Sequence, residues 1–442
     1  MGLTSKLDKL KLKSSSDEKV DKPAKMDNNS STNTNTSSNS IEDNTDDIDE
    51  LDNEGQSILM GIISQLRPGM DLTKITLPTF ILEKKSMLER ITNFFQIPGI
   101  LLEANDEDDE LKRFLLMVKW YLASWHIAPK AVKKPLNPVL GEVFTCYWDN
   151  LPEDKKAYYI SEQTSHHPPK SSYFYLIPES KIRVDGIVIP KSKFLGNSSA
   201  AMMEGWGHVT LGERDNELYL MNQPNVYCRG ILFGKLRYEL GDHMYVKCPT
   251  TGYEADIEFK TKGFISGTYD AIEGTIKNKD GDLLYNISGK WNDVMEIKDT
   301  KTGKKEVFFD VKSCTKSKPQ VKPLDEQWDF ESQKLWKDTI DALSDRNHEL
   351  ATAAKSKVED SQRQLAKKRV EDGVSFHPRL FHEVNDDDKL NQDLEYLLYK
   401  HLDLSDDAET LEQKLFQVLP ILPGQEFDDK FHIPAFKKKS SS

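Results

Sequence analysis

The sequence predicts a mainly β protein with flanking helices, an α+β chain whose middle forms an antiparallel barrel or sandwich. From about residue 141 to 313, short runs rich in Tyr, Phe, Val and Ile alternate with turn residues, as in YYISEQ and YFYLIP. This spacing is typical of many short antiparallel strands. Helical periodicity precedes this region at 108–125 and returns after Pro323, through about Arg369.

Residues 1–54 are expected to form a disordered polar and acidic tail. The tail passes from scattered lysines through the tract NNSSTNTNTSSNS to an acidic run between Glu42 and Glu54. Such a composition buries too little apolar surface to offset the entropy of ordering. The tail is then either a solvated leader or an electrostatic gate whose acidic run repels anionic membranes.

The next segments are expected to form an N-terminal lid and helices. The amphipathic stretch SILMGIISQL (57–66) predicts a helix that either packs on the core or acts as a movable lid at about 55–70. Pro78 lies in an extended stretch, because proline is excluded from helix interiors. Helices are expected at about 85–125, where acidic residues 108–110 suit a helix N-terminus.

The β region is expected at about 140–315, and a C-terminal helical region at about 325–436. The segment EVFFDVK (306–312) alternates like a strand and is assigned to the wall of the barrel. Turn signals such as KDGD (279–282) separate the expected strands.

Composition excludes several classes of function. A net charge of −13 argues against nucleic-acid binding, which requires clustered cations. The four cysteines form no CxxC pair, so free thiols in a reducing compartment are expected. A membrane-spanning run of about 18 apolar residues is absent from the sequence, as are GxSxG, GxGxxG and HExxH motifs. We therefore expect no catalytic residues, metal site or cofactor.

The most unusual pair is His166-His167, followed by Pro168 and Pro169. Adjacent side chains on a strand point to opposite faces, which makes such a pair a poor metal site. The prolines end the strand, and a strand end at a barrel rim can meet a ligand. Imidazoles that donate hydrogen bonds suit a phosphate oxygen, especially when the phosphate causes them to be partly protonated.

Two further elements offer charges. Lys134 and Asn137 lie in the Pro-rich segment KKPLNP, which is read as a rim loop or as an ordinary turn with surface lysines. Lys355, Glu359 and Arg363 have the i, i+4, i+8 spacing of one helix face. They form either an exposed row of salt bridges or a phosphate-binding site, in which Lys355 and Arg363 bind the phosphate and Glu359 orients them.

Together, the octapeptide EQTSHHPP (162–169), the loop KKPLNPVLGE and the pattern KxxxExxxR resemble the oxysterol-binding protein family. The octapeptide differs from the family hallmark EQVSHHPP only at Thr164, where one β-branched residue replaces another. The resemblance extends over about residues 56–436, which indicates one lipid-binding domain at 55–436 after the tail. The chain is most similar to short yeast members.

The resemblance implies a nearly closed antiparallel β-barrel around a lipid tunnel, with a lid and C-terminal helices beside its mouth. It also implies a head-group site for phosphatidylinositol 4-phosphate, formed by Lys134, Asn137, His166, His167, Lys355, Glu359 and Arg363. The stretches TLPTFILEKKS and PKSKFLGNS resemble the phosphatidylserine-transferring members, so Leu77 and Ser192 are expected to select phosphatidylserine.

The expected function is exchange of phosphatidylserine for phosphatidylinositol 4-phosphate between endoplasmic reticulum and plasma membrane. The alternatives are a sterol exchanger, and a lipid sensor or scaffold without net transfer. A monomeric, cytoplasmic, non-enzymatic carrier is expected, with peripheral membrane contact at contact sites and a possible protein tether.

Overall fold

The computed structural model describes residue 69, residues 79–127, 133–230, 237–263 and 267–426, and the backbone of 436–438. These residues all belong to one compact unit, residues 44–442. The predicted tail at 1–54, Leu77, and the predicted lid apart from Gly69 lie outside the described residues.

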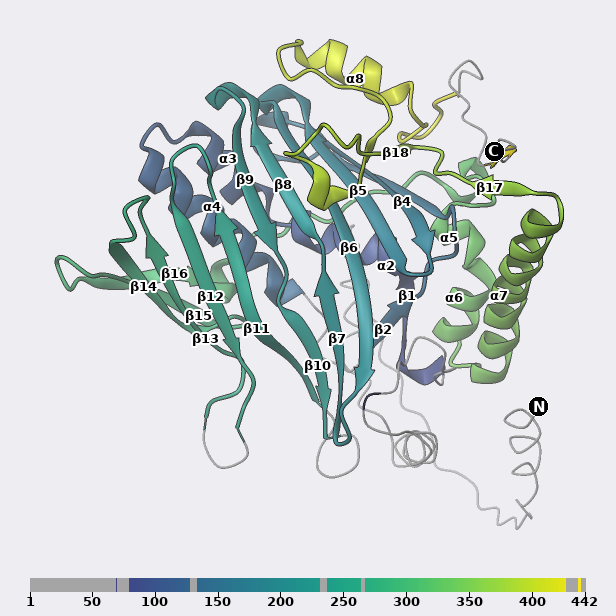
Figure 1. Ribbon diagram of the computed structural model, residues 1–442, viewed down its shortest axis with the longest axis horizontal. Helices are drawn as coiled ribbons and strands as arrows, with labels where there is room; N and C mark the ends of the chain where they lie inside the picture. The colour runs from purple at the N-terminus through teal and green to yellow at the C-terminus, as the bar shows by residue number, and fades with distance from the viewer. Residues whose placement is uncertain are drawn as a thin grey trace, which may run out of the picture. The chain divides into compact units, whose positions relative to one another are not determined.

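The main element is a 14-stranded sheet in which the paired strands are antiparallel. Its strands are β3 (Val143–Trp148), β4 (Ala157–His166), β5 (Pro169–Ile177), β6 (Ile182–Phe194), β7 (Ser198–Glu204), β8 (Trp206–Leu211), β9 (Glu217–Asn222), β10 (Asn225–Arg229), β11 (Arg237–Lys247), β12 (Glu254–Lys260), β13 (Ala271–Lys277), β14 (Leu283–Lys290), β15 (Val294–Asp299) and β16 (Lys305–Asp310). The prediction of a mainly β fold with an antiparallel sheet is confirmed (Figure 1).

The sheet is a meander in which β7–β8 and β9–β10 each act as one interrupted long strand. Strand β6 pairs with β8 through one half and with β7 through the other. Gly205 separates β7 from β8 with φ +112°, and a Cβ there would lie 2.1 Å from the Ile187 carbonyl oxygen. The close approach therefore requires glycine. The path ends at β3 and β16, and no pairing joins these two strands within the described residues.

The largest core cluster lies between one face of the sheet and the helices α3 (Pro98–Asp106) and α4 (Glu110–Ser124). Asp109 is the N-cap of α4, since its side chain accepts a hydrogen bond from the Lys112 backbone N–H. The helix predicted at 108–125 is thereby confirmed. Phe95, just before α3, stacks on Tyr175 of β5 with ring centroids 4.2 Å apart.

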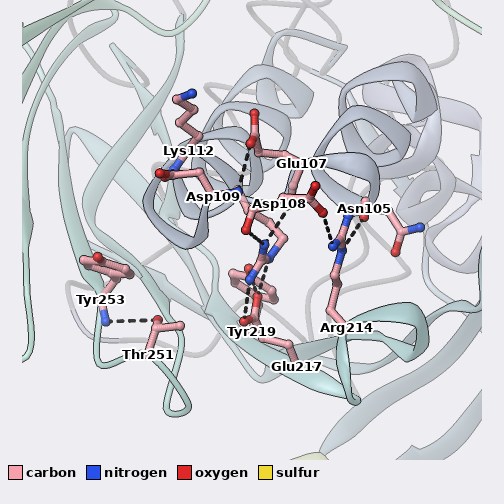
Figure 2. Close-up of polar contacts among 11 residues, drawn as sticks. Asn105, Glu107, Asp108, Asp109, Lys112, Arg214, Glu217, Tyr219, Thr251 and Tyr253 are labelled. Atoms are coloured by element: carbon pink, nitrogen blue, oxygen red, sulfur yellow. Dashed lines mark hydrogen bonds and ion pairs between the residues drawn. The ribbon is translucent and has the colours of Figure 1, made fainter.

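A buried ion pair fixes α4 to the sheet. Arg113 donates to both carboxylate oxygens of Glu217 at 2.8 and 3.0 Å, and both side chains are buried. Figure 2 shows Glu217 and Tyr219 of β9 pointing toward the start of α4, where Arg214 also pairs with Asp108.

The C-terminal part covers the other face of β3–β5. A second core cluster joins these strands to residues from 380 to 421, which include α8 (Ala408–Phe416) and the hairpin of β18 (Phe381–Glu383) and β19 (Tyr396–Leu398). Because both faces of β4 are covered, its first eight residues are buried without alternation. The predicted C-terminal helical region thus also contains short strands, including β17 (Val374–Phe376), which pairs with β20 (Phe436–Lys438).

A third cluster positions the elements of the candidate site. The strands β1 (Leu82–Ser86) and β2 (Lys134–Leu136) form a parallel pair. They pack with α6 (Lys337–Ser344) and α7 (His348–Glu371), which lie side by side in Figure 1. The short helices α2 (Met87–Arg90) and α5 (Ser332–Leu335) complete this region. In the described part of the chain, no helix has both the length and the apolar character needed to cross a membrane.

Candidate functional site

The octapeptide 162–169 forms a tight β-hairpin. Strand β4 ends at His166, β5 begins at Pro169, and His166 pairs with Pro169 across the turn. The rings of His166 and His167 lie side by side, with centroids 4.5 Å apart. The expectation that they point to opposite faces is wrong, because His167 belongs to the turn and strand alternation stops at His166.

His166 is held as a neutral ring. Burial, together with the neighbouring His167, lowers its pKa to about 4, although the Pro138 carbonyl and Glu359 oppose the change. Its Nε2 lies 2.7 Å from the side-chain nitrogen of Gln362 on α7. The free ring is therefore neutral at pH 7, and the partial protonation that the sequence argument ascribes to a bound phosphate stays a prediction.

Lys134 faces α7 from β2. Its side chain lines a cavity, and desolvation together with the charge of Lys355 lowers its pKa, while Glu359 raises it. Asn137 lies just after β2, exposed, and lines the same cavity. The segment predicted as a loop thus forms the short strand β2 at Lys134, and a role of both residues in head-group binding stays a prediction.

Helix α7 supplies one ion pair to the group. Lys355 pairs with Glu359, and the Lys355 side chain is only 14% exposed. Arg363 instead pairs with Asp360, and its side chain is 64% exposed. The structure thus gathers Lys134, His166, Lys355 and Glu359 and leaves Arg363 facing solvent.

The cavity beside this group has a volume of about 300 Å³ and a mostly apolar wall. The polar residues on this wall include Gln163, Ser171 and Ser192. The Ser192 hydroxyl is buried and has no hydrogen-bond partner among the described residues, which leaves it available to a ligand. Leu77, its predicted partner in selectivity, lies outside the described residues.

Two carboxylates of the motifs have structural roles. Glu162 accepts hydrogen bonds from the backbone N–H groups of Arg379 and Leu380, both at 2.8 Å, which fastens the C-terminal segment to β4. Burial raises the pKa of Glu162 to about 7. Glu142 is also buried and receives four donors, which come from Ser86, Val139, Ser332 and Trp336.

Thr164, the departure from the hallmark octapeptide, has polar partners. Its hydroxyl lies 3.0 Å from the Ser172 hydroxyl and 3.3 Å from the Lys170 carbonyl oxygen. The extra oxygen, relative to valine, is therefore satisfied inside the β4–β5 hairpin.

Gln362 and Arg369 were missed by sequence reasoning, although helix geometry signals them. At about 100° per residue, Gln362 lies about 20° from the direction of Lys355, and Arg369 about 40° on the same side. Arg363 lies about 80° away on the other side. Arg369 is close enough for its charge to lower the pKa of His166.

Comparison with known proteins identifies the family. Residues 61–341, more than half of the chain, match the family described as Oxysterol-binding protein. Among curated relatives, Oxysterol-binding protein-like protein OBPalpha of Candida albicans is 66% identical over 443 residues and covers 100% of both chains. Oxysterol-binding protein homolog 6 of Saccharomyces cerevisiae is 61% identical over 404 residues, covering 90% of this chain and 89% of the homolog.

Solved structures share the fold. The Osh1 ORD domain in complex with cholesterol superposes with a TM-score of 0.67 at 23% identity, covering 81% of this chain and 88% of that one. The Osh3 ORD in complex with PI(4)P from Saccharomyces cerevisiae superposes with a TM-score of 0.59 at 20% identity, covering 81% and 92%. The sequence matches and the shared fold together place this chain in the oxysterol-binding protein family.

Proposed function

We propose that this chain carries lipids between membranes, binding phosphatidylinositol 4-phosphate with its phosphate at the group formed by Lys134, His166 and Lys355. The observation that carries the proposal is that Lys134 lines an apolar cavity. Lys355 is close enough for its charge to lower the pKa of Lys134, and His166 lies 2.7 Å from Gln362 of the helix that carries Lys355. A phosphate monoester needs cations and donors, whereas acyl chains need only apolar surface. The Osh3 structure, which shares this fold, contains PI(4)P.

Moving a lipid through water without such a cavity would cost a large free energy. Two acyl chains contain roughly 30 methylenes, and exposing each to water costs about 0.8 kcal/mol, or more than about 20 kcal/mol in total. An apolar cavity removes most of this cost during transit. Because acyl chains are nearly alike, discrimination between lipids must come from polar groups at the wall and rim.

The second lipid is proposed to be phosphatidylserine, exchanged between endoplasmic reticulum and plasma membrane. Support comes from the Ser192 hydroxyl on the cavity wall, which has no partner among the residues that the structure describes, and from the resemblance of its segment to phosphatidylserine-transferring members. A sterol is the alternative cargo, because the Osh1 structures of the same fold contain cholesterol and ergosterol. Mass spectrometry of lipids that co-purify with the chain distinguishes these cargoes.

The head-group assignment is tested by replacing His166 and His167 with Ala. Extraction of phosphatidylinositol 4-phosphate from liposomes is expected to be abolished, whereas the exposed His382→Ala control should extract normally. Undiminished extraction by the double variant would show that these histidines do not form the head-group site. Lipid transfer measured beside binding separates a carrier from a sensor, and chemically unchanged lipid after incubation argues against an enzyme.

A further inference from the structure

The side chain of Gln362 joins three segments of the candidate site. Its Oε1 accepts a hydrogen bond from the Leu140 backbone N–H at 2.6 Å, and its Nε2 lies 2.7 Å from His166 Nε2. The side-chain amide of Gln362 on α7 therefore contacts both the loop before β3 and the end of β4.

The orientation of this amide follows from the chemistry of its partners. A backbone N–H only donates, so the oxygen of Gln362 must face Leu140 and the NH₂ group must face His166. His166 Nε2 therefore accepts and carries no proton. The ring proton lies on Nδ1, which is buried beside the Pro138 carbonyl.

Both nitrogens of His166 are therefore unavailable to a ligand in this arrangement. Nδ1 is enclosed by protein, and Nε2 is occupied by the amide of Gln362. The charged groups that act on the ring are His167 and Arg369, which disfavour its protonation, and Glu359, which favours it. A phosphate dianion would add negative charge and favour the protonated ring, which can no longer accept from the amide.

We propose that Gln362 lowers the affinity of the site for a phosphate monoester, because such a ligand must displace its amide before His166 can donate to the phosphate. This inference rests on the proposed binding of a phosphate-bearing head group. A phosphate monoester, which is largely dianionic at neutral pH, raises the pKa of His166, so that the ring takes a proton from solvent and the amide is displaced. A phosphodiester lipid carries one negative charge and leaves the bond between Gln362 and His166 intact. Gln362 thereby weakens binding of the monoester lipid without affecting the second cargo.

The test compares Gln362→Met, which keeps the length of the side chain but cannot hydrogen-bond, with Gln364→Met at an exposed position of the same helix. Binding is measured to liposomes that contain phosphatidylinositol 4-phosphate or phosphatidylinositol, and to soluble glycerophosphoinositol 4-phosphate. Removing one neutral hydrogen bond should tighten binding of both monoester ligands by about two- to tenfold. Binding of phosphatidylinositol should not change, and Gln364→Met should match the wild type.

Weaker or unchanged monoester binding by Gln362→Met would overturn the proposal, as would an equal change for both lipids. Thermal unfolding of each variant shows whether it is folded, and Gln362→Glu provides a second variant. Its carboxylate can still accept from Leu140 and can also accept from a protonated His166, so this variant should raise the pH at which the ring titrates.

Nitrogen NMR of the histidine rings separates this inference from the proposed function. In the lipid-free wild type, His166 should show an unprotonated Nε2, which becomes protonated when phosphatidylinositol 4-phosphate is added. A protonated Nε2 in the lipid-free protein would refute the role of Gln362. A wild type that shows the expected tautomer but binds no phosphoinositide would refute the proposed function.

Discussion

Replacing Glu162 with Gln should flatten the pH dependence of stability. The Glu162 carboxyl is fully buried, and its pKa is raised from the ordinary value of 4.5 to about 7. Desolvation is the main cause, while the donors at Arg379 and Leu380 partly oppose it. The folded protein therefore holds a proton that the unfolded chain releases between about pH 4.5 and 7.

The sign and size of the effect follow from proton linkage. Because the folded state binds more protons in this window, the contribution of Glu162 to stability is complete below pH 4.5 and is lost as the pH rises through 7. A displacement of about 2.5 pKa units, at about 1.4 kcal/mol each, corresponds to about 3 kcal/mol. Gln cannot ionise, so the Gln variant lacks this loss. Its amide instead loses one backbone donor, a penalty of about 1–3 kcal/mol that is independent of pH.

The assay is urea unfolding of both proteins at several pH values from 4.5 to 8, followed by circular dichroism and fluorescence to check that the transitions coincide. As the pH rises across this range, the free energy of unfolding of the wild type should fall by about 3 kcal/mol relative to that of the variant. The contributions of all other titrating groups cancel in the difference. The free energy of unfolding of the control Glu258→Gln, at an exposed position of β12, should change with pH in the same way as that of the wild type. Parallel curves for Glu162→Gln would refute the reasoning.

Three further changes test the site and the fold. Lys355→Ala should weaken phosphatidylinositol 4-phosphate binding at least tenfold, because it removes a nearly buried charged donor, whereas Arg363→Ala should change binding less than threefold. Equal losses in a liposome assay would show that Arg363 turns into the site. Arg113→Met removes the cationic partner of the buried Glu217 carboxylate, which keeps the Tyr219 hydroxyl as a donor. The variant should lower the free energy of unfolding by about 3–5 kcal/mol in urea titrations, and a loss below 1 kcal/mol would contradict this. Gly141→Ala should cost more than Gly303→Ala in the same titrations, because both have positive φ but only the first Cβ meets a ring, at 3.1 Å.

The fold was largely predictable because its local signals agree with its long-range packing. Alternating apolar residues with turn signals predicted the antiparallel strands between about residues 140 and 315, and periodic apolar residues predicted α4. The C-terminal part, which covers the second face of β3–β5, was less predictable. Between residues 380 and 404 it consists of short strands and turns whose positions depend on distant partners such as Glu162 and β5.

The octapeptide EQTSHHPP shows why a motif predicts a site better than it predicts the role of each residue in it. Glu162 fastens the C-terminal segment, and Gln163 accepts from the Ser171 hydroxyl while lining the cavity. His166, the last residue of β4, is hydrogen-bonded to Gln362 of α7. A buried carboxylate that receives backbone donors tolerates replacement as poorly as a ligand-binding histidine does, since both depend on fixed geometry in a low dielectric. Residue type and spacing alone therefore cannot separate these roles, whereas hydrogen-bond partners can. The same reasoning explains Gln362, whose neutral side chain carries no chemical signal until its partners at Leu140 and His166 are known.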